Sequence, residues 1–346
     1  MKALVYKNVN EIILDEIQEL EFPPSNWVKV QVRASGLCGS DIHKFLYQKP
    51  PENYLTTSVL GHEITGEVIE IGKGVNEIKV GDRVAVEPII PCEICDYCLA
   101  GKTQLCKNIK SIGRNYCGGF AERILVPAKN IWILPNHISF SEGTQVDLVA
   151  VAVHALNVSQ PNLKNWSCAV IGDGSLGLIT AQVAKAFGAA KVFLFAKHEV
   201  KKGVAEELGI TSLIIQDNKQ FEIEHKNQFD IVFETVGGRQ TDTLNNGITI
   251  TAPNGKLIVL GVFDFGYSPT IQVRNAFYKE VSIVGINSYS KSLDKSDFGF
   301  ALSLIADGLI DVNKIITHKF NLNQFQEVFS QIKTKASIIK AVFENH

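Results

Sequence analysis

Hydrophobic and polar residues alternate along the first part of the chain as they do in half-buried strands. Residues 27–32 place valine at every second position, with Lys29 and Gln31 between, which is typical of a strand with one buried face. Glycines at 72, 74 and 81 interrupt the pattern, as turn residues do. We therefore predict a β-rich region over about the first 135 residues. Its predicted strands are 27–32, 64–71, 82–86, 120–126 and 131–134.

The period of the pattern changes at residue 139, where Ser141 is a candidate helix cap ahead of a helix over 146–156. Short apolar runs then alternate with helical patterns over 176–187 and 200–208. Strand–helix alternation predicts a parallel, doubly wound sheet. Its predicted strands are 168–171, 192–195, 212–215, 230–233, 256–260 and 281–284.

The last 60 residues no longer repeat that unit. They predict a helix over 298–306, a strand near 315–320, a helix near 324–332 and a final strand over 338–343. A tail of this kind can return to the first domain. A chain of 346 residues is also long for one hydrophobic core, so two domains are expected.

Composition removes several classes of function. The formal net charge is −2, so there is neither a basic field for nucleic acid nor a polybasic tail for a membrane surface. No apolar run approaches the roughly 20 residues that span a bilayer. The first residues lack the apolar core of a signal peptide, and seven cysteines without such a signal favour thiolate ligands over disulfides. We expect a cytoplasmic protein with no membrane and no nucleic-acid partner.

One short loop contains four cysteines with the spacing C-x2-C-x2-C-x7-C. Four thiolates fill a tetrahedral zinc site and leave no position for substrate, so this zinc is expected to be structural. A zinc ribbon that binds nucleic acid is the alternative, but acidic Glu93 and Asp96 dilute the nearby lysines. The cysteines are Cys92, Cys95, Cys98 and Cys106.

A second set of ligands stands apart from that loop. Cys38 offers a soft anionic ligand, and the adjacent pair His62-Glu63 offers an imidazole and a carboxylate. Three protein ligands leave a coordination position open, as a catalytic metal requires. We therefore predict a second, catalytic zinc held by Cys38, His62 and Glu63.

Residues beside Cys38 have the chemistry to move a proton. The hydroxyl of Ser40 can lie beside the substrate oxygen, and His43 can pass the proton to solvent because histidine as a residue type exchanges protons near neutral pH. The carboxylate of Asp41 can orient a ligating histidine through the free ring nitrogen. Ser40, His43 and Glu63 are the candidate catalytic residues.

A glycine-rich turn follows the apolar run 168–171 and precedes a helical pattern. Its form, G-x-G-x-x-G, is the dinucleotide-binding pattern when a strand and a helix flank it in this way. The first glycine allows the turn, the second lets a pyrophosphate approach the backbone, and the third lets the helix pack on the strand. The turn is Gly172-Asp173-Gly174-Ser175-Leu176-Gly177.

The acid that usually follows the second strand is absent. An Asp or Glu near position 196 would bind the 2′-hydroxyl of the adenosine ribose, but Ala196 stands there. Lys197, His198 and Lys201 follow, and they can form a pocket for a 2′-phosphate; the alternative is that these lysines are simply solvated. We expect NADP to be favoured over NAD.

These motifs together resemble the zinc-containing medium-chain alcohol and polyol dehydrogenases. The resemblance rests on GLCGSDIH at 36–43, GHE at 61–63, the four-cysteine loop and the glycine-rich turn. It implies a GroES-like β-rich catalytic domain (1–150 and 287–346) plus a Rossmann doubly wound parallel-sheet domain (151–286), an α/β fold overall. It also implies a catalytic and a structural zinc, and homodimers or homotetramers.

Within that family the chain looks most like the sorbitol, threonine and galactitol-phosphate dehydrogenases. Their Glu-Pro-Leu before a histidine is similar to Asp147-Leu148-Val149 ahead of His154, so Asp147 is a further candidate zinc ligand although its side chain is one methylene shorter. The resemblance implies hydride transfer between NAD(P) and a polyhydroxylated secondary alcohol or its ketone. A simple alcohol or aldehyde dehydrogenase and a catalytically silent NADP-binding protein are the alternatives.

Overall fold

The structure is a computed structural model that describes residues 1–46, 57–159, 165–292, 295–334 and 337–345. The chain forms two compact units. The first comprises Met1–Asp147, Ser290–Ala306 and Ile316–His346, and the second comprises Leu148–Tyr289 and Asp307–Ile315. These boundaries differ from the expected ones mainly at residues 307–315, which cluster with the second unit.

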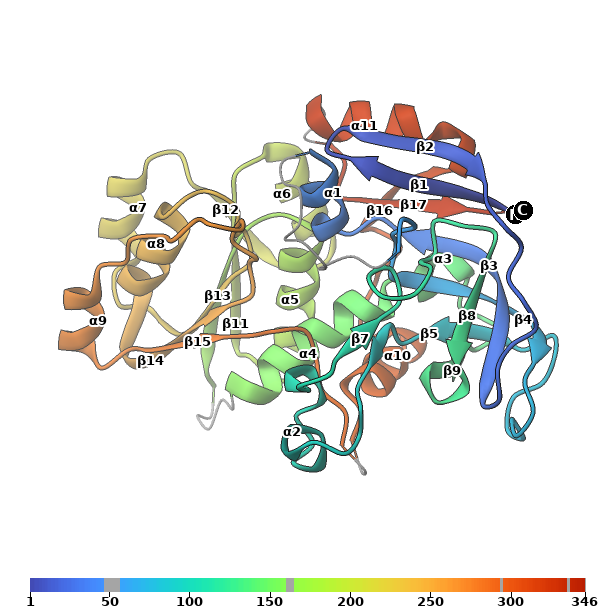
Figure 1. Cartoon of the computed structure of the whole chain (residues 1–346). Coiled ribbons are helices and arrows are strands. Elements are labelled where there is room, and N and C mark those ends of the chain that lie inside the picture. The colour runs from blue at the N-terminus through green and yellow to red at the C-terminus, as the bar shows by residue number, and fades with distance from the viewer. Residues whose placement is uncertain (47–56, 160–164, 293–294, 335–336, 346) are drawn as a thin grey trace. The chain divides into compact units, whose positions relative to one another are not determined.

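A mostly antiparallel sheet forms the centre of the first unit, and both ends of the chain contribute to it (Figure 1). The strand order is β16-β17-β3-β4-β5-β9, and β8 also pairs with β3. The valines of the alternating segment, Val28, Val30 and Val32, are fully buried in its core. The strands are β3 (Trp27–Gly36), β4 (Glu63–Ile71), β5 (Arg83–Val86), β8 (Arg123–Pro127), β9 (Ile131–Ile133), β16 (Ile316–Phe320) and β17 (Lys340–Glu344).

Strand register within this sheet brings distant parts of the chain together. Gly36 at the end of β3 lies opposite Glu63 at the start of β4. On the other side of β3, Gly36 lies opposite Val342 of the last strand. The first residues of β4 and β17 therefore meet around the end of β3, immediately before the segment that carries Cys38.

Smaller elements complete the first unit. They are β1 (Lys2–Asn8), β2 (Glu11–Glu16), α1 (Gly39–Leu46), β6 (Ile89–Ile90), α2 (Asp96–Leu99), η1 (Thr103–Leu105), β7 (Lys110–Ser111), η2 (Ala128–Asn130), α3 (Phe140–Gly143), α10 (Asp297–Ala306), η3 (Leu322–Gln324) and α11 (Phe325–Thr334). The alternation pattern did not predict β1, β2 or α1.

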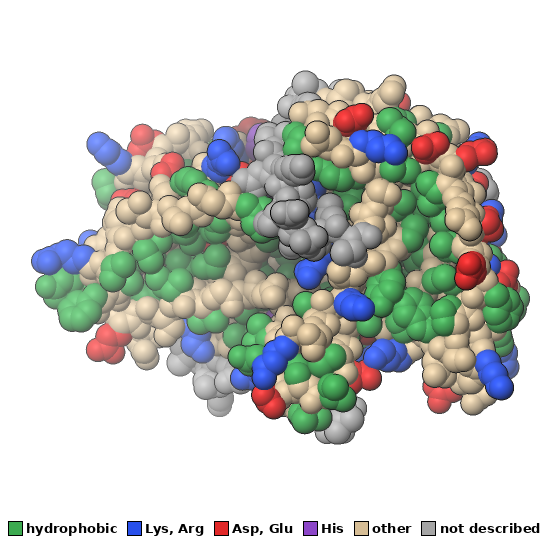
Figure 2. Space-filling view, viewed as in Figure 1, with side chains coloured by type: hydrophobic (Ala, Val, Ile, Leu, Met, Phe, Trp, Pro, Cys, Tyr) green, Lys and Arg blue, Asp and Glu red, His purple; other side chains and the backbone are tan. Residues whose placement is uncertain are grey.

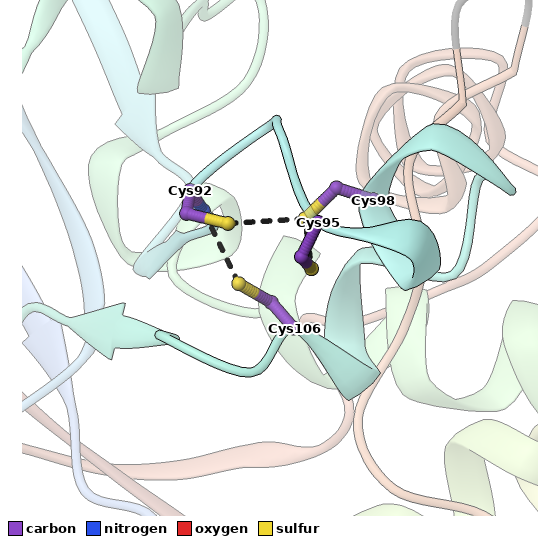
Figure 3. Close-up of side chains that lie close together, drawn as sticks. All are labelled: Cys92, Cys95, Cys98 and Cys106. Atoms are coloured by element: carbon purple, nitrogen blue, oxygen red, sulfur yellow. Dashed lines mark hydrogen bonds between the residues drawn. The ribbon is translucent and has the colours of Figure 1, made fainter.

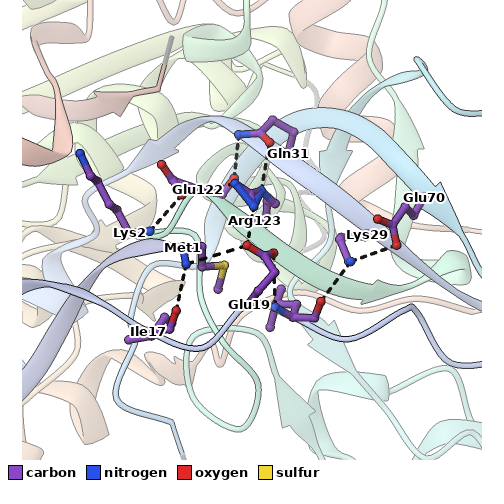
Figure 4. A network of polar contacts seen from close by, with 10 residues as sticks. Met1, Lys2, Ile17, Glu19, Lys29, Gln31, Glu70, Glu122 and Arg123 are labelled. Carbon is purple, nitrogen blue, oxygen red and sulfur yellow. Dashed lines mark hydrogen bonds and ion pairs between the residues drawn. The ribbon is translucent and has the colours of Figure 1, made fainter.

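A polar network ties the N-terminal strands to β8 (Figure 4). The α-amino group of Met1 donates to the carbonyl of Ile17 at 2.9 Å and lies 3.8 Å from the carboxylate of Glu19. Glu19 in turn pairs with Arg123 of β8 at 2.5 Å, and Arg123 also contacts Glu122 at 3.4 Å. Segments about 100 residues apart in the sequence are thereby joined at the edge of the unit.

The second unit contains a six-stranded sheet in which every described strand pairing is parallel. The strand order β12-β11-β10-β13-β14-β15 reverses between β10 and β13, which is the doubly wound arrangement. The strands are β10 (Ser167–Ile171), β11 (Lys191–Ala196), β12 (Thr211–Ile214), β13 (Phe229–Glu234), β14 (Thr251–Val259) and β15 (Ser282–Gly285).

Helices cover this sheet and bury its apolar side chains. Helix α5 packs on β10 and β11, α6 packs on β11 and β12, and α8 packs on β13 and β14. Val232, Ile248 and Leu257 are fully buried in the resulting core. The helices are α4 (Val146–Ser159), α5 (Ser175–Ala186), α6 (Glu199–Glu207), α7 (Asn218–His225), α8 (Asp242–Ile250) and α9 (Val273–Lys279).

The predicted cap at Ser141 is wrong. Ser139 caps α3 in a capping box, because its hydroxyl accepts from the backbone of Glu142 and the Glu142 carboxylate accepts from the backbone of Ser139. The Ser141 hydroxyl instead donates to Glu344 of the last strand. A serine three residues before a glutamate was the stronger signal in the sequence.

Candidate active site and metal centres

The four cysteines of the short loop converge on one point (Figure 3). All four sulfur atoms lie within 4.8 Å of one another. The Sγ atoms of Cys92 and Cys98 are 4.0 Å apart, and those of Cys95 and Cys98 are 3.5 Å apart. Helix α2 begins directly after Cys95, and Cys106 follows η1. Two short helical turns therefore fold a 15-residue segment around a cage of sulfur atoms.

Backbone N–H groups point at these sulfurs, as they do around thiolates. Those of Cys92 and Asn108 donate to Cys106 Sγ at 3.2 and 3.4 Å. Backbone N–H groups of Cys98 and Lys107 lower the pKa of Cys95 to about 6, whereas burial raises the pKa of Cys98 to about 12. Four close sulfurs cannot all ionise without a cation among them. The donor set fits zinc, with no position left for a substrate.

Replacing Cys95 by Ser should remove one zinc and destabilise the fold more than it impairs chemistry. A structural zinc contributes folding free energy directly, and serine is a poor ligand for it. We expect zinc content to fall by one ion per chain, with a lower midpoint of unfolding. Cys168→Ser is the control, because this buried thiol belongs to neither set. Unchanged zinc content in Cys95→Ser would contradict the structural role.

The second ligand set also comes together. One ligand atom from each of Cys38, His62 and Glu63 lies within 4.8 Å of the other two. Cys38 lies between β3 and α1, and His62 and Glu63 lie at the start of β4. The register of β3 against β4 thus creates the set from two segments that are 24 residues apart (62 − 38).

The electrostatics of this second set favour a cation. Burial would lower the pKa of His62, but the negative charges of Asp41, Cys38 and Asp147 raise it to about 10. Asp41 is buried, and its Oδ2 lies 3.6 Å from His62 Nδ1, so that its charge acts directly on the imidazole ring. A cysteine, an imidazole and several acids around one point form a donor set that fits zinc.

Lys340 is a member of this cluster that sequence reasoning missed. Its ammonium group lies 2.6 Å from Glu63 Oε1 and 2.5 Å from Oε2, and both side chains are almost completely buried. Burial would lower the pKa of Lys340, but Glu63, Cys38 and Asp147 raise it, so the lysine keeps its charge. The only signal in the sequence was a lysine within an otherwise apolar final strand.

A glycine makes room for this pair. A Cβ atom at Gly36 would lie only 2.0 Å from Glu63 Oε2. The end of β3 therefore has no side chain where the Glu63 carboxylate passes. The close approach explains why the segment GLCGSDIH begins with glycine.

The other predicted residues take different positions around the set. Ser40 and His43 are both half-buried on α1 and, three residues apart, lie on one side of that helix. Asp147 is buried in the first turn of α4, and its charge acts on His62 and Lys340. Among the described residues, the ligand atoms that converge within 4.8 Å do not include a carboxylate oxygen of Asp147.

The glycine turn has the geometry that dinucleotide binding requires. Gly172 has a φ of +120°, and a Cβ there would lie 2.5 Å from Thr235 Oγ1; a Cβ at Gly177 would lie 2.0 Å from the carbonyl of Gly172. By contrast, a Cβ at Gly174 would meet nothing within 4 Å. Gly174 precedes Ser175, the first residue of α5. Gly172 and Gly177 thus allow close packing, and Gly174 leaves open space at the N-terminus of α5, where a pyrophosphate fits.

The end of β11 differs from a simple lysine-lined pocket. Ala196 is buried and Lys197 is exposed. Asp173, from the glycine turn, holds the next residues: its Oδ2 accepts from the backbone N–H of Lys197 at 2.9 Å and from that of His198 at 2.8 Å. Lys201 approaches Asp173 Oδ1 at 3.7 Å. The sequence placed Lys197 and Lys201 here but assigned no role to Asp173.

A doubly wound unit with a dinucleotide turn, and a β-rich unit with two zinc-type ligand sets, define a zinc-dependent nicotinamide oxidoreductase. Residues 24–136 match the alcohol dehydrogenase GroES-like domain, and residues 175–307 match the zinc-binding dehydrogenase family. The chain belongs to the zinc-type alcohol dehydrogenases, as the sequence motifs predicted. None of the helices in the described ranges combines the length and apolar character needed to cross a membrane.

Similar proteins cover nearly the whole chain. L-idonate 5-dehydrogenase from Vitis vinifera is 30% identical over 91% of this chain and 87% of its own length. The crystal structure of galactitol-1-phosphate dehydrogenase from Escherichia coli has a TM-score of 0.88 at 26% identity, with 100% of both chains covered. A putative zinc-binding dehydrogenase from Sinorhizobium meliloti 1021, bound to NADP, has a TM-score of 0.88 at 27% identity over 99% of both chains. The GroES-like and Rossmann folds are thus confirmed.

Proposed function

We propose that the protein transfers a hydride between NAD(P) and a polyol, cyclitol or other secondary alcohol, or the matching ketone. The observation that carries this proposal is the convergence of Cys38, His62 and Glu63 in a partly buried cluster beside acidic side chains. Three protein ligands leave room for a substrate oxygen. The names of similar proteins, which act on L-idonate and galactitol 1-phosphate, support a polyhydroxylated substrate.

Cys38 and His62 would hold the catalytic zinc, with Glu63 as a third ligand and Asp147 as an alternative one. When bound there, zinc supplies a Lewis acid that lowers the pKa of an alcohol substrate. Lys340 keeps the Glu63 carboxylate in place and offsets part of its charge. The carboxylate of Asp41, next to His62 Nδ1, would orient the imidazole ring. The four-cysteine loop would hold the second, structural zinc.

Ser40 and His43 would carry the proton that leaves the alcohol. Both lie on the same side of α1, directly after Cys38. A hydroxyl can accept a proton while donating its own, and a histidine exchanges protons with solvent near neutral pH. A bound nicotinamide would supply the hydride acceptor, so that no protein group has to accept electrons.

Acids beside the ligand set suit a substrate with several hydroxyl groups. Asp147 is buried and lies close enough to act electrostatically on His62 and Lys340. A buried carboxylate can accept a hydrogen bond from a second substrate hydroxyl, and a substrate without that hydroxyl would leave the acceptor unsatisfied. This favours polyols over ethanol-like substrates.

A substrate panel tests the function. Sugars, polyols, cyclitols, hydroxy-amino acids and simple primary alcohols would be assayed for kcat/KM with each cofactor in the zinc-loaded enzyme. We expect a polyhydroxylated secondary alcohol to be the best substrate. Faster turnover of simple primary alcohols would indicate an ordinary alcohol dehydrogenase. No turnover with any alcohol, despite cofactor binding, would indicate a silent binding protein.

We further propose that NADP is preferred over NAD. Ala196 removes the acid that would repel a 2′-phosphate, and the exposed Lys197 offers that phosphate a charge-assisted hydrogen bond, each such bond being worth about 1.5–3 kcal/mol. We expect kcat/KM to favour NADP by roughly tenfold or more, and Ala196→Asp/Lys197→Ala to reverse the preference. Lys202→Ala is the control, because Lys202 pairs with Glu199 and Glu206 along its own helix.

The outcome against this preference is simple to recognise. Wild-type enzyme that already favours NAD, or a ratio that the double variant leaves unchanged, would show that Lys197 points only to solvent. The same kinetics with Lys202→Ala separates a local effect from a general loss of positive charge on α6.

We also infer that the protein assembles as a homodimer or homotetramer. Strand β15 ends the described sheet of the second unit, with Ile283 40% exposed. Helix α9 next to it exposes Val273, Phe277 and Tyr278 at 61%, 73% and 68%, and apolar side chains gather over these elements (Figure 2). An open strand edge beside apolar side chains favours pairing with a second copy. Sedimentation of the purified enzyme measures the assembly state.

We also propose that the enzyme is cytoplasmic, because none of its seven cysteines, all of which lie in the described ranges, forms a disulfide.

A further inference from the structure

Asp173 stands at the centre of a charged cluster that the cofactor motif by itself does not explain. It occupies the second position of the glycine turn, between β10 and α5. Its Oδ2 accepts three hydrogen bonds, from the backbone N–H of Lys197, the backbone N–H of His198 and the ring Nδ1 of His198, at 2.9, 2.8 and 2.8 Å. Its Oδ1 lies 3.7 Å from the ammonium group of Lys201.

Parallel pairing of β10 with β11 explains the contact. Ile171 lies opposite Phe195 in the register of the two strands. Asp173 and Lys197 are each two residues beyond that pair, so the turn after β10 and the turn after β11 meet at the same edge of the sheet. In doubly wound folds this edge faces the adenosine ribose of a bound dinucleotide.

Asp173 keeps its negative charge in this position. Burial alone would raise its pKa, but the charge of Lys201 and the donors of Lys197 and His198 lower it. The His198 side chain is 36% exposed and that of Lys201 is 12% exposed. His198 and Lys201 are thus directed to an internal carboxylate, while Lys197 forms no side-chain hydrogen bond or ion pair with the described residues.

We propose that Asp173 is a specificity-determining residue that restrains the preference for a 2′-phosphate over a 2′-hydroxyl on the cofactor. The carboxylate holds His198 and Lys201, so they offer less of their charge to a phosphate. It also places one negative charge beside the site, where it repels a phosphate dianion and accepts from a hydroxyl. This inference rests on the proposed use of a nicotinamide cofactor.

The sequence around the site makes the restraint effective. In the usual arrangement an acid at the end of the strand equivalent to β11 disfavours the 2′-phosphate, but Ala196 provides no carboxylate. Asp173 brings a carboxylate to the same turn from the neighbouring strand. Ala196 and Lys197 therefore favour the 2′-phosphate, while Asp173 acts in the opposite direction, and selectivity is the balance of the two.

The test compares binding of two probes that cannot undergo hydride transfer, ADP-ribose and 2′-phospho-ADP-ribose. Their dissociation constants would be measured by titration calorimetry on the zinc-loaded enzyme, for wild type, Asp173→Asn and Glu199→Gln. Asparagine keeps an oxygen to accept from the backbone N–H groups of the turn but removes the charge. Glu199 is the matched control, because it is an acid one residue after His198 whose side chain is 73% exposed.

We expect Asp173→Asn to shift the affinity ratio toward 2′-phospho-ADP-ribose by about tenfold, as removal of a close like charge predicts. Glu199→Gln should shift it by less than about twofold, because solvent screens exposed charges. The ratio of the two dissociation constants is taken within one variant. A general loosening of the turn, or partial unfolding, weakens binding of both probes and therefore leaves this ratio unchanged.

Two results would overturn the inference in different ways. If wild type binds at least one probe but Asp173→Asn shifts the ratio no more than Glu199→Gln does, Asp173 serves only to shape the turn. In that case the proposed function stands. If wild type binds neither probe, the nicotinamide-dependent function and this role of Asp173 both fail.

Discussion

Replacing Cys38 by Ser lowers turnover by roughly a thousandfold or more while leaving the fold intact. The variant removes a thiolate from the set that Cys38 forms with His62 and Glu63. Loss of Lewis-acid activation costs several kcal/mol of transition-state stabilisation, and each 1.4 kcal/mol is a factor of about ten in rate. We expect zinc content to fall to one ion per chain, with an unchanged circular dichroism spectrum and unfolding midpoint.

Cys117→Ser is the matched control for that experiment. This thiol belongs to neither ligand set, and burial raises its pKa to about 12, so it is inert at neutral pH. Its replacement should leave kcat/KM within about twofold of wild type, in keeping with a substitution away from the catalytic groups. Activity above a tenth of wild type in Cys38→Ser, with only the structural zinc present, would contradict a catalytic metal at Cys38.

Replacing Lys340 by Met destabilises the protein by about 3–5 kcal/mol, because it leaves the Glu63 carboxylate buried without its cation. Neither side chain has appreciable exposure, so water cannot substitute for the lost partner. Methionine retains most of the aliphatic volume, which separates the charge effect from a cavity effect. The measurement is the free energy of unfolding in denaturant at pH 7, in protein without zinc at the Cys38 site, so that no second cation pairs with Glu63.

Two further variants identify the cause. Lys340→Arg keeps the charge and should retain more of the stability. Glu63→Gln/Lys340→Met removes both charges and should be more stable than Lys340→Met alone, since no unpaired ion remains. If the free energy of unfolding of Lys340→Met lies within about 1 kcal/mol of the wild-type value, the ion pair does not hold the carboxylate in place. The proposed positioning of Glu63 by Lys340 is then wrong.

Motifs confined to one segment could be read directly from the order of residues. The four cysteines lie within 15 residues. A segment that short brings its four thiolates together by folding around one point, without help from distant parts of the chain. The glycine turn is equally local, because Gly172 and Gly177 meet each other across a few residues. Alternation of valines predicted the buried face of β3 because side chains of a strand point to opposite faces in turn.

Other features depended on register and were not visible in the sequence. Lys340 and Glu63 are 277 residues apart, and their ion pair exists because β17 pairs with β3 on the side opposite β4. A lysine in an apolar strand gives no indication of which acid it meets. Segments β1, β2 and α1 were not predicted either, because the apolar residues of β1 and β2 run together without strict alternation and α1 spans only eight residues.

The sequence by itself determined the class of protein, the two ligand sets and the dinucleotide turn, because residue type and short spacing specify that chemistry. Only the tertiary structure decided what surrounds those residues. It directs His198 and Lys201 to Asp173 and buries Lys340 against Glu63. The physical reason is that the electrostatic environment of a charged side chain depends on its neighbours in space. Strand pairing brings those neighbours from distant parts of the chain.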